Sequence, residues 1–142
     1  MKRFNENKII KNILENSKLK TDSKYPANLD IIKGIGDDAA YWKDDKFAYC
    51  TSTDSLVENV HFKLNYFTPT ELGKKSIAVN LSDIAAMGAT PLGMLISLGI
   101  TKSQDEEWIN EFYKGVFELS ESYNSPVLGG DLVYSSNLFI SI

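Results

Sequence analysis

The sequence predicts an α/β sandwich, in which helices cover one face of a mixed β-sheet. Three observations support this fold class. Short apolar segments with strand character alternate with longer segments of helical periodicity, and two of the helical segments begin with strong N-terminal signals. The chain of 142 residues is 43% hydrophobic and 24% charged, the composition of an ordinary globular protein. Its length suits a single domain or a part of a larger fold.

The first half of the chain predicts one helix and two strands. Residues 5–19 place Ile and Leu at helical spacing among Lys, Asn and Glu, as in an amphipathic surface helix. Residues 20–30 are rich in Asp, Ser, Lys, Pro and Asn and are expected to form a loop. A short strand is expected at 30–32, followed by a turn over 34–38, and a second strand at 47–52.

The second half predicts a helix and then a buried strand. Thr68 to Glu71 combines a capping box with proline at the first helical position, so a helix is expected from here to about Met87. Gly88 is expected to end that helix. Residues 92–100 are almost entirely apolar and predict a strand buried on both faces.

A further helix and two strands complete the predicted order. Residues 103–106, Ser-Gln-Asp-Glu, predict a second capping box, and apolar residues continue at helical spacing to Tyr123. Strands are expected at 127–128 and 138–142. Because the sequence ends within an apolar strand, we expect these residues to be part of a longer fold.

Charge and cysteine content exclude several classes of protein. The net charge is -4, which gives no general attraction toward nucleic acid or an anionic membrane surface. Cys50 is the only cysteine, so an intramolecular disulfide and a cysteine zinc cluster are excluded. No signal-peptide pattern follows Met1, and the apolar stretch 91–100 is too short to span a bilayer. A cytoplasmic protein is expected.

Two nucleotide-binding motifs match only nominally. Residues 34–39 fit G-x-G-x-x-A, but Asp37 and Asp38 would place carboxylates where a dinucleotide fold binds pyrophosphate. This repulsion disappears if divalent metal lies between the carboxylates and the phosphate. Residues 73–76 resemble the end of a P-loop, yet they lie inside a capped helix and Thr68 replaces the required glycine. Both motifs are rejected.

Scattered aspartates beside small or polar residues form the remaining candidate site. They are Asp37, Asp38, Asp54, Asp83 and Asp131. Taken singly, each is better explained as a turn or cap residue. Asp83 is the exception, because its helix is apolar on most faces and an unpaired carboxylate there would cost several kcal/mol, on the order of its desolvation penalty. Together the acids favour an oxygen-ligated ion such as Mg²⁺ over zinc.

His61 is the only histidine and has three open interpretations from sequence alone. It could be a general base, a metal ligand or an ordinary half-buried residue, and the last is favoured for a lone histidine. No Ser-His-Asp arrangement can be argued from the spacing.

Five motifs in order carry a family likeness. They are Gly34 to Ala40, Ser52 to Ser55, Val60 to Phe62, Ala78 to Ala89 and Gly129 to Asp131. With these motifs the chain resembles the amino-terminal domain of thiamine-monophosphate kinases, from about residue 30 to its end. The likeness implies the fold of the aminoimidazole ribonucleotide synthetase superfamily, with residues 1–142 as one ATP- and Mg²⁺-binding domain and the carboxy-terminal domain absent. It also implies ATP-dependent conversion of thiamine monophosphate to thiamine diphosphate, in a homodimer formed by sheet pairing.

The resemblance also assigns roles to individual residues. It implies a magnesium site formed by Asp38, Ser52, Thr53, Asp54, Asp83 and Asp131. It implies nucleotide contacts at Tyr113, Gly130 and Asp131 and a substrate contact at His61, with Tyr113 equally well explained as a packing residue. Asp37 is left as a neighbour that adds negative potential.

Two departures keep other readings open. Family members are roughly twice as long as this chain and carry an ATP-binding arginine beyond its last residue, so this chain alone is expected to turn over little. Leu132 to Tyr134 stand where some members carry threonines. The alternatives are a hydrogenase-maturation-type protein of the same superfamily and a non-catalytic dimerisation or metal-binding fragment.

Overall fold

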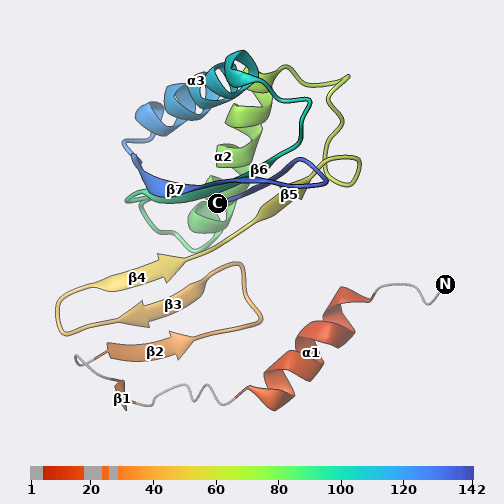
Figure 1. Cartoon of the computed structure of the whole chain (residues 1–142). Helices are drawn as coiled ribbons and strands as arrows, with labels where there is room; N and C mark the ends of the chain where they lie inside the picture. Colours follow the sequence, from red (N-terminus) through yellow and green to blue (C-terminus); the bar gives the residue numbers. More distant parts are fainter. Residues whose placement is uncertain (1–4, 18–23, 26–28) are drawn as a thin grey trace. The chain divides into compact units, whose positions relative to one another are not determined.

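The computed structural model describes residues 5–17, 24–25 and 29–142 (Figure 1). The chain divides into two compact units, Met1–Ser52 and Thr53–Ile142, and each is described by itself. Each unit contains its own four-stranded sheet.

The first unit is a helix followed by an antiparallel sheet of strands in sequence order. The elements are α1 Glu6–Asn16, β1 Lys24–Tyr25, β2 Leu29–Lys33, β3 Ala40–Lys43 and β4 Ala48–Thr51. The helix expected over 5–19 is confirmed within the described residues, and its N-cap is Asn5, whose side chain accepts a hydrogen bond from the Lys8 amide at 3.1 Å. Strand β3 was not predicted; it pairs with β4 along its whole length.

The hairpin of β3 and β4 is closed by one carboxylate and one aromatic pair. Asp44 Oδ1 accepts hydrogen bonds from the amides of Lys46 and Phe47, both at 2.7 Å. These bonds hold the pKa of Asp44 below its usual value. The Trp42 and Tyr49 rings stack across the strands with centroids 4.3 Å apart. The turn thus fixes the register that brings the end of β4 beside the turn before β3.

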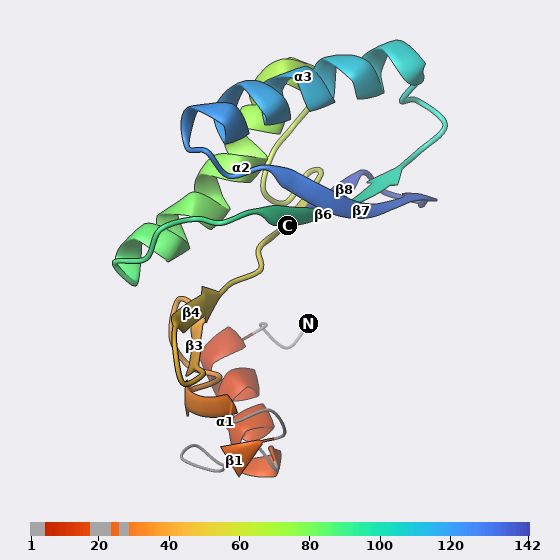
Figure 2. The same cartoon turned by 90° about the vertical axis from the view of Figure 1, so that its left-hand side faces the viewer.

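The second unit has two helices on one face of a mixed sheet (Figures 1 and 2). The elements are β5 Ser55–Val57, α2 Pro69–Ala86, β6 Met94–Ile100, α3 Glu106–Ser122, β7 Val127–Tyr134 and β8 Phe139–Ser141. The strand order is β5-β8-β6-β7, with β6 and β7 parallel and the other pairs antiparallel. The predicted mixed sheet covered by helices is confirmed in this unit.

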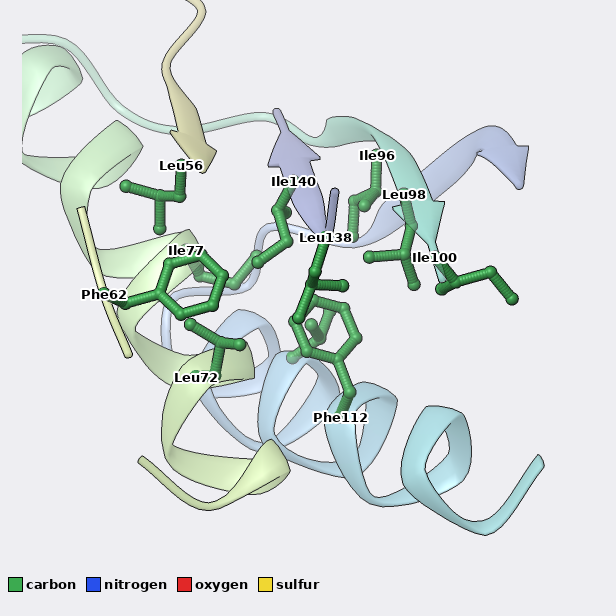
Figure 3. Packing of buried hydrophobic residues seen from close by; sticks show 11 residues of the cluster. Leu56, Phe62, Leu72, Ile77, Ile96, Leu98, Ile100, Phe112, Leu138 and Ile140 are labelled. Carbon is green, nitrogen blue, oxygen red and sulfur yellow. The ribbon is translucent and has the colours of Figure 1, made fainter. Parts of the chain in front are cut away.

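The core of the second unit lies between this sheet and the two helices (Figure 3). The sheet side of the core includes Leu56, Ile96, Leu98 and Ile140 on the strands, together with Leu138 just before β8. The helices contribute Leu72, Ile77, Phe112 and Val116. Phe112 and Leu72 are fully buried. Burying one such side chain stabilises the fold by about 1.5–3 kcal/mol.

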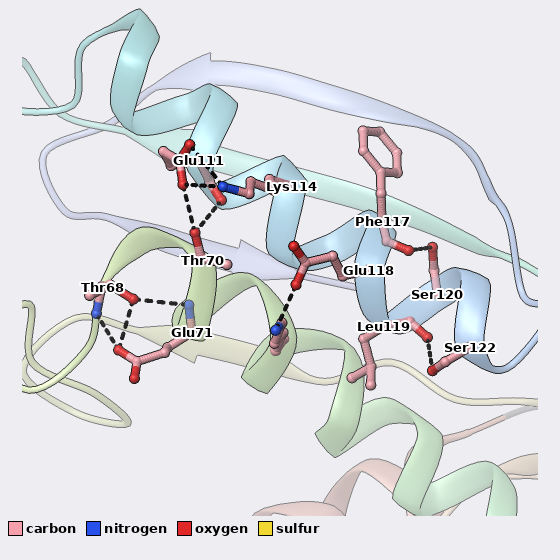
Figure 4. A network of polar contacts seen from close by, with 11 residues as sticks. Thr68, Thr70, Glu71, Glu111, Lys114, Phe117, Glu118, Leu119, Ser120 and Ser122 are labelled. Atoms are coloured by element: carbon pink, nitrogen blue, oxygen red, sulfur yellow. Dashed lines mark hydrogen bonds and ion pairs between the residues drawn. The ribbon is translucent and has the colours of Figure 1, made fainter.

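Helices α2 and α3 approach each other closely because each presents a glycine at the contact. A Cβ at Gly73 would lie 2.9 Å from the Val116 amide nitrogen, and a Cβ at Gly115 would lie 2.9 Å from Thr70 Cα. The Thr70 hydroxyl then donates to the Glu111 carbonyl at 3.1 Å or to its carboxylate at 2.9 Å (Figure 4). The helix pair is therefore held by backbone proximity and by a polar link.

The ends of α2 agree with the predicted signals. The Thr68 hydroxyl accepts a bond from the Glu71 amide at 3.2 Å, and the Glu71 carboxylate accepts one from the Thr68 amide at 2.8 Å. Gly88, at φ +65°, follows the C-cap residue Met87, as expected for a helix terminator.

Two other predictions for this unit are wrong. The N-cap of α3 is Asp105, whose side chain accepts from the Trp108 amide at 2.8 Å, so residues 103–106 are not a capping box. Strand β6 is not buried on both faces: Leu95 is 64% exposed. Within this unit the helices cover only one face of the sheet; on the other face Leu95 is exposed and Ser97 half-buried, although Gly99 is buried.

Candidate functional site

In the first unit, the Gly-Asp-Asp turn is tied to the end of β4. The Ser52 hydroxyl donates to the Asp38 carbonyl oxygen at 3.1 Å. Asp38 is exposed at the surface. The turn at 34–38 leads into strand β3 and not into a helix, which agrees with the rejection of the dinucleotide motif. The structure therefore brings together two of the predicted ligands, Asp38 and Ser52.

Asp37 is engaged by neighbours within the same turn. Its carboxylate pairs with Lys33 and also accepts a hydrogen bond from the Asp38 amide at 3.1 Å. The bond with Lys33 and then the Asp38 amide hold the pKa of Asp37 below its usual value. The Asp37 carboxylate is thus engaged within the turn, and the ligand role of Asp38 stays a prediction.

In the second unit, Asp54 is anchored to helix α2 by Asn80. The Asp54 amide donates to Asn80 Oδ1 at 3.1 Å and to the Ile142 carbonyl oxygen at 3.0 Å. Asn80 Nδ2 donates in turn to the Ser76 carbonyl oxygen at 3.0 Å. The backbone of Asp54 is thus fixed between α2 and Ile142, the residue that follows β8, while its side chain remains exposed together with that of Thr53.

Asp83 lies one turn beyond Asn80, in the last turn of α2. It is half-buried and has an interaction partner. The last turn of α2 carries no basic residue. Because the helix dipole places partial negative charge at this end, a carboxylate here is electrostatically unfavourable unless a cation is near. The role of Asp83 as a magnesium ligand stays a prediction.

Asp131 lies in a row of polar residues that crosses the sheet. Pairing places Asp131 on β7 beside Ser97 on β6, Ser97 beside Ser141 on β8, and Ser141 beside Ser55 on β5. The Ser55 and Ser141 hydroxyls are 3.0 Å apart and hydrogen-bonded. The neighbours of Ser97 along β6, Ile96 and Leu98, are buried, so this row lies on the face away from the helices.

The same register separates Asp131 from Asp54. Ser55, the neighbour of Asp54, is three strands from Asp131, about 14 Å at a spacing of about 4.8 Å per strand. One ion cannot be bound by both carboxylates over this distance, since ligand bonds to Mg²⁺ are only about 2.0–2.1 Å. The two aspartates are not brought together in this unit.

Gly130 allows β7 to approach β6 closely. A Cβ there would clash with the Ile96 carbonyl oxygen, whereas a Cβ at Gly129 would lie 3.6 Å from Leu95 Cδ2, an ordinary contact. The backbone before Asp131 is therefore open on one side and pressed against β6 on the other. Such bare backbone also permits close approach by a ligand.

His61 lies in the tight turn that follows β5. Its Nδ1 atom accepts a hydrogen bond from the Val57 amide at 3.0 Å, and its own amide donates to the Val57 carbonyl oxygen at 2.9 Å. Its carbonyl oxygen accepts from Lys75 Nζ at 3.1 Å. The imidazole is exposed but oriented by its neighbours.

Tyr113 packs among aromatic residues of α3. Its ring meets Phe112 edge-on with centroids 5.4 Å apart and lies 5.8 Å from the Phe117 ring. Burial raises the pKa of Tyr113. These contacts support the packing interpretation, and the nucleotide contact stays a prediction.

The candidate ligands have the chemistry that a hard cation requires, but their acidic side chains do not lie together in the described residues. Every candidate ligand offers oxygen: carboxylates from Asp38, Asp54, Asp83 and Asp131, and hydroxyls from Ser52 and Thr53. Oxygen donors are those that Mg²⁺ prefers. In the parts of the chain that the structure describes, no three His, Cys, Asp or Glu side chains lie together as a metal site.

Sequence reasoning missed three contributions to this region. Asn80 holds the backbone of Asp54 by accepting a hydrogen bond from its amide. Ser97 and Ser141 were not singled out at all. The signal for Ser97 was present, since it is the one hydroxyl between buried Ile96 and Leu98, but only strand pairing places it beside Asp131.

Sequence comparisons find several similar proteins. Thiamine-monophosphate kinase of Bacillus subtilis is 42% identical over 75% of this chain, and that of Escherichia coli K12 is 41% identical over 74%. The matched regions are 33% and 32% of those proteins, so the chain spans about a third of the relatives it matches. No helix in the described residues is both long and apolar enough to cross a membrane.

Comparison with solved structures finds proteins with a similar fold. A structure described as AaThiL complexed with AMPPCP and TMP matches 94% of this chain at 34% identity and a TM-score of 0.75, covering 38% of that protein. HypE of Escherichia coli matches 63% of this chain at 23% identity and a TM-score of 0.53, which shows likeness of fold alone. Residues 36–142 match the family model described as AIR synthase related protein, N-terminal domain. The chain therefore belongs to the AIR synthase related proteins and carries the N-terminal domain of that family.

Proposed function

We propose that this chain is the nucleotide- and metal-binding part of a thiamine-monophosphate kinase, which transfers the terminal phosphoryl group of ATP to thiamine monophosphate. The observation that supports this most is the match, over 94% of the chain, with a related structure complexed with AMPPCP and TMP. The identities of 41–42% with thiamine-monophosphate kinases support the same reaction. We place the protein in the cytoplasm.

The acid-rich, histidine-poor site suits this reaction. The acceptor is a phosphate monoester, which is already mostly ionised near neutral pH because its second pKa is about 6. Deprotonation by a general base is therefore of little use, and the barrier lies in bringing anionic groups together. When bound, Mg²⁺ supplies charge neutralisation between the phosphates.

Individual residues have distinct roles in this proposal. The magnesium ligands are Asp38, Ser52, Thr53, Asp54, Asp83 and Asp131. Because Asp131 is too far from Asp54 to share an ion, at least two ions are needed in this arrangement. Gly130 and Asp131 contact the nucleotide through the bare edge of β7, and Tyr113 contributes on the ATP side. His61 contacts thiamine monophosphate.

The partner proposed is a second copy of the chain, paired through the sheet of the second unit. Strand β7 is at the edge of that sheet and carries exposed apolar side chains: Leu128 is 68%, Leu132 52% and Tyr134 82% exposed. An edge strand of this kind offers unpaired backbone groups and apolar area to another strand.

The dimer is tested by light scattering after size exclusion. Tyr134→Lys is expected to convert a dimer to a monomer, because charge on an edge strand opposes pairing. Tyr123→Lys is the control, since Tyr123 is 53% exposed at the end of α3. A chain that is monomeric before any substitution contradicts the pairing.

Nucleotide and metal binding are tested by thermal unfolding. A non-hydrolysable ATP analogue is expected to raise the melting temperature only when Mg²⁺ is present, since a ligand at about 100 times its Kd stabilises by about 2.7 kcal/mol. Asp54→Asn and Asp83→Asn should each abolish the shift. Glu107→Gln makes the same charge change at an exposed position of α3 and should keep it.

Two outcomes count against the kinase. Absence of any shift, or a shift unchanged in both aspartate variants, favours a non-catalytic dimerisation or metal-binding fragment. The reaction itself is tested by thiamine diphosphate formation, compared between this chain and a longer parent protein. The hydrogenase-maturation alternative is supported only by likeness of fold.

A further inference from the structure

His61 caps the free edge of strand β5. The amides of Asp54 and Glu58, the residues on either side of β5, donate to the carbonyl oxygens of Ile142 and Leu138, the residues on either side of β8, both at 3.0 Å. Since alternate residues of a strand point their amides to opposite sides, the Val57 amide points away from β8. It faces the outer edge of this unit's sheet, because β5 is an end strand in the order β5-β8-β6-β7. His61 Nδ1 is its acceptor.

The turn holds the imidazole in this position. Asn59 adopts a left-handed conformation at φ +62°, and its amide donates to the Phe62 carbonyl oxygen at 2.8 Å. Phe62 is only 4% exposed and anchors the turn in the core. On the other side, Lys75 Nζ holds the His61 carbonyl oxygen at 3.1 Å and lies 4.9 Å from the centre of the Phe67 ring.

This hydrogen bond fixes where the proton of the imidazole lies. A ring nitrogen that accepts a backbone N–H must carry a lone pair, so Nδ1 is unprotonated. In a neutral imidazole the proton is then on Nε2, which can donate but cannot accept. To act as a general base or a metal ligand, Nε2 would need a lone pair, and the proton of the neutral ring would then lie on Nδ1. That proton would face the Val57 N–H, and the hydrogen bond between them would be lost. With this hydrogen bond in place, Nε2 cannot act as a general base or as a metal ligand. The third interpretation, an ordinary half-buried residue, is wrong because His61 is exposed.

We propose that His61 contacts the substrate as a neutral imidazole that donates a hydrogen bond from Nε2–H, and that it thereby selects a ligand atom that accepts. This proposal rests on the proposed function for the identity of the ligand. In thiamine monophosphate the acceptors are the phosphate oxygens and the unprotonated pyrimidine nitrogens. The exocyclic amino group, a donor, is not a suitable partner.

The single histidine makes the test direct. Labelling the chain with ¹⁵N-histidine gives one imidazole in a two-bond ¹H–¹⁵N correlation spectrum, recorded near pH 8, above the ordinary histidine pKa of about 6.5. Nδ1 is expected in the unprotonated region and Nε2 in the protonated region. A proton on Nδ1, or an average of both forms, overturns the proposal.

Ligand titration then tests the donor role. With Mg²⁺ and a non-hydrolysable ATP analogue present, thiamine monophosphate is expected to shift Nε2 and leave Nδ1 nearly unchanged. A shift also produced by thiamine indicates a pyrimidine nitrogen as acceptor, whereas a shift with thiamine monophosphate alone indicates the phosphate. Binding that moves neither nitrogen overturns the contact. Failure of the chain to bind any of these ligands contradicts the proposed function, and the ligand-free spectrum still decides the tautomer.

Two substitutions separate the donor from the edge cap. In His61→Asn the side-chain oxygen can accept from Val57 at the position of Nδ1, but nothing replaces Nε2. This variant should keep its melting temperature and bind thiamine monophosphate roughly tenfold or more weakly, as for loss of one hydrogen bond to a charged group. His61→Gln should melt lower and retain more of the binding. Unchanged affinity in His61→Asn overturns the proposal; if that variant does not fold, the spectra decide.

Discussion

Replacing Gly115 by alanine should destabilise the second unit, although alanine is the better helix former. In an isolated helix the change would stabilise by about 0.5–1 kcal/mol. In the fold, the new Cβ would lie 2.7 Å from the Thr70 carbonyl carbon and 2.9 Å from its Cα. Carbon atoms prefer about 3.5–4.0 Å, so α2 and α3 must separate.

The cost of that separation exceeds the gain in helix propensity. Overpacking costs about 1–3 kcal/mol, and the upper end applies because the obstacle is backbone that cannot change rotamer. Subtracting the helix gain leaves a net loss of about 2 kcal/mol. Separation would also lengthen the 2.9 Å bond from Thr70 to Glu111.

Urea unfolding followed by far-ultraviolet circular dichroism measures this loss, since α2 and α3 have 18 and 17 residues against 11 in α1. Asn110→Ala, at an exposed position of α3, is the control and should stabilise by about 0.5 kcal/mol. Gly73→Ala should lower the free energy of unfolding less in the Gly115→Ala chain than in the unchanged chain, because both glycines lie at one helix contact. A Gly115→Ala chain as stable as the unchanged one would refute the reasoning.

Three further substitutions test other parts of the structure. Gly130→Ala should lower the free energy of unfolding by about 1–3 kcal/mol in urea titrations, and by more than Gly129→Ala. Both glycines have positive φ, +159° and +158°, so both substitutions strain the backbone, but only the Gly130 Cβ also meets the backbone of β6. The Thr68 amide and hydroxyl hold the pKa of Glu71 below its usual 4.5. The stability that this carboxylate adds is therefore present above pH 4.5 and lost as the pH falls through the lowered pKa. Glu71→Gln should flatten this acidic part of the curve of melting temperature against pH. Asp38→Asn should raise the Mg²⁺ concentration needed for the nucleotide-induced melting shift more than Asp37→Asn does, because Asp37 is already paired with Lys33.

Each of these three predictions has an outcome that contradicts it. Equal losses from the two glycine substitutions would show that backbone conformation, and not the contact with β6, requires glycine. An unchanged acid limb in the glutamine variant would mean that the capping carboxylate does not contribute to stability. Equal Mg²⁺ requirements in the two aspartate variants would mean that pairing with lysine does not decide which carboxylate binds the ion.

Local signals along the sequence determined the helices and the end of α2. Thr68 and Glu71 lie within one turn, and Gly88 acts on the residues just before it, so their effect depends on near neighbours alone. The apolar periodicity that predicted α3 is likewise a property of consecutive residues. The cap of that helix was misplaced because Ser103 and Asp105 are both good capping residues, and the choice depends on the preceding turn, where the Thr101 amide bonds to Gln104.

The candidate site depended on tertiary structure because its parts are distant in the sequence. Asp54 and Asn80 are joined by one hydrogen bond across 26 residues, and no local sequence pattern predicts that contact. Strand pairing set Asp131 beside Ser97 and, by the same register, away from Asp54. The composition of the sequence thus determined the kind of donor group available in the chain, carboxylate and hydroxyl oxygens. The order and register of the strands decided which of these oxygens lie near one another. The tautomer that we propose for His61 also depends on tertiary structure, since the pairing of β5 with β8 turns the Val57 amide toward His61 Nδ1.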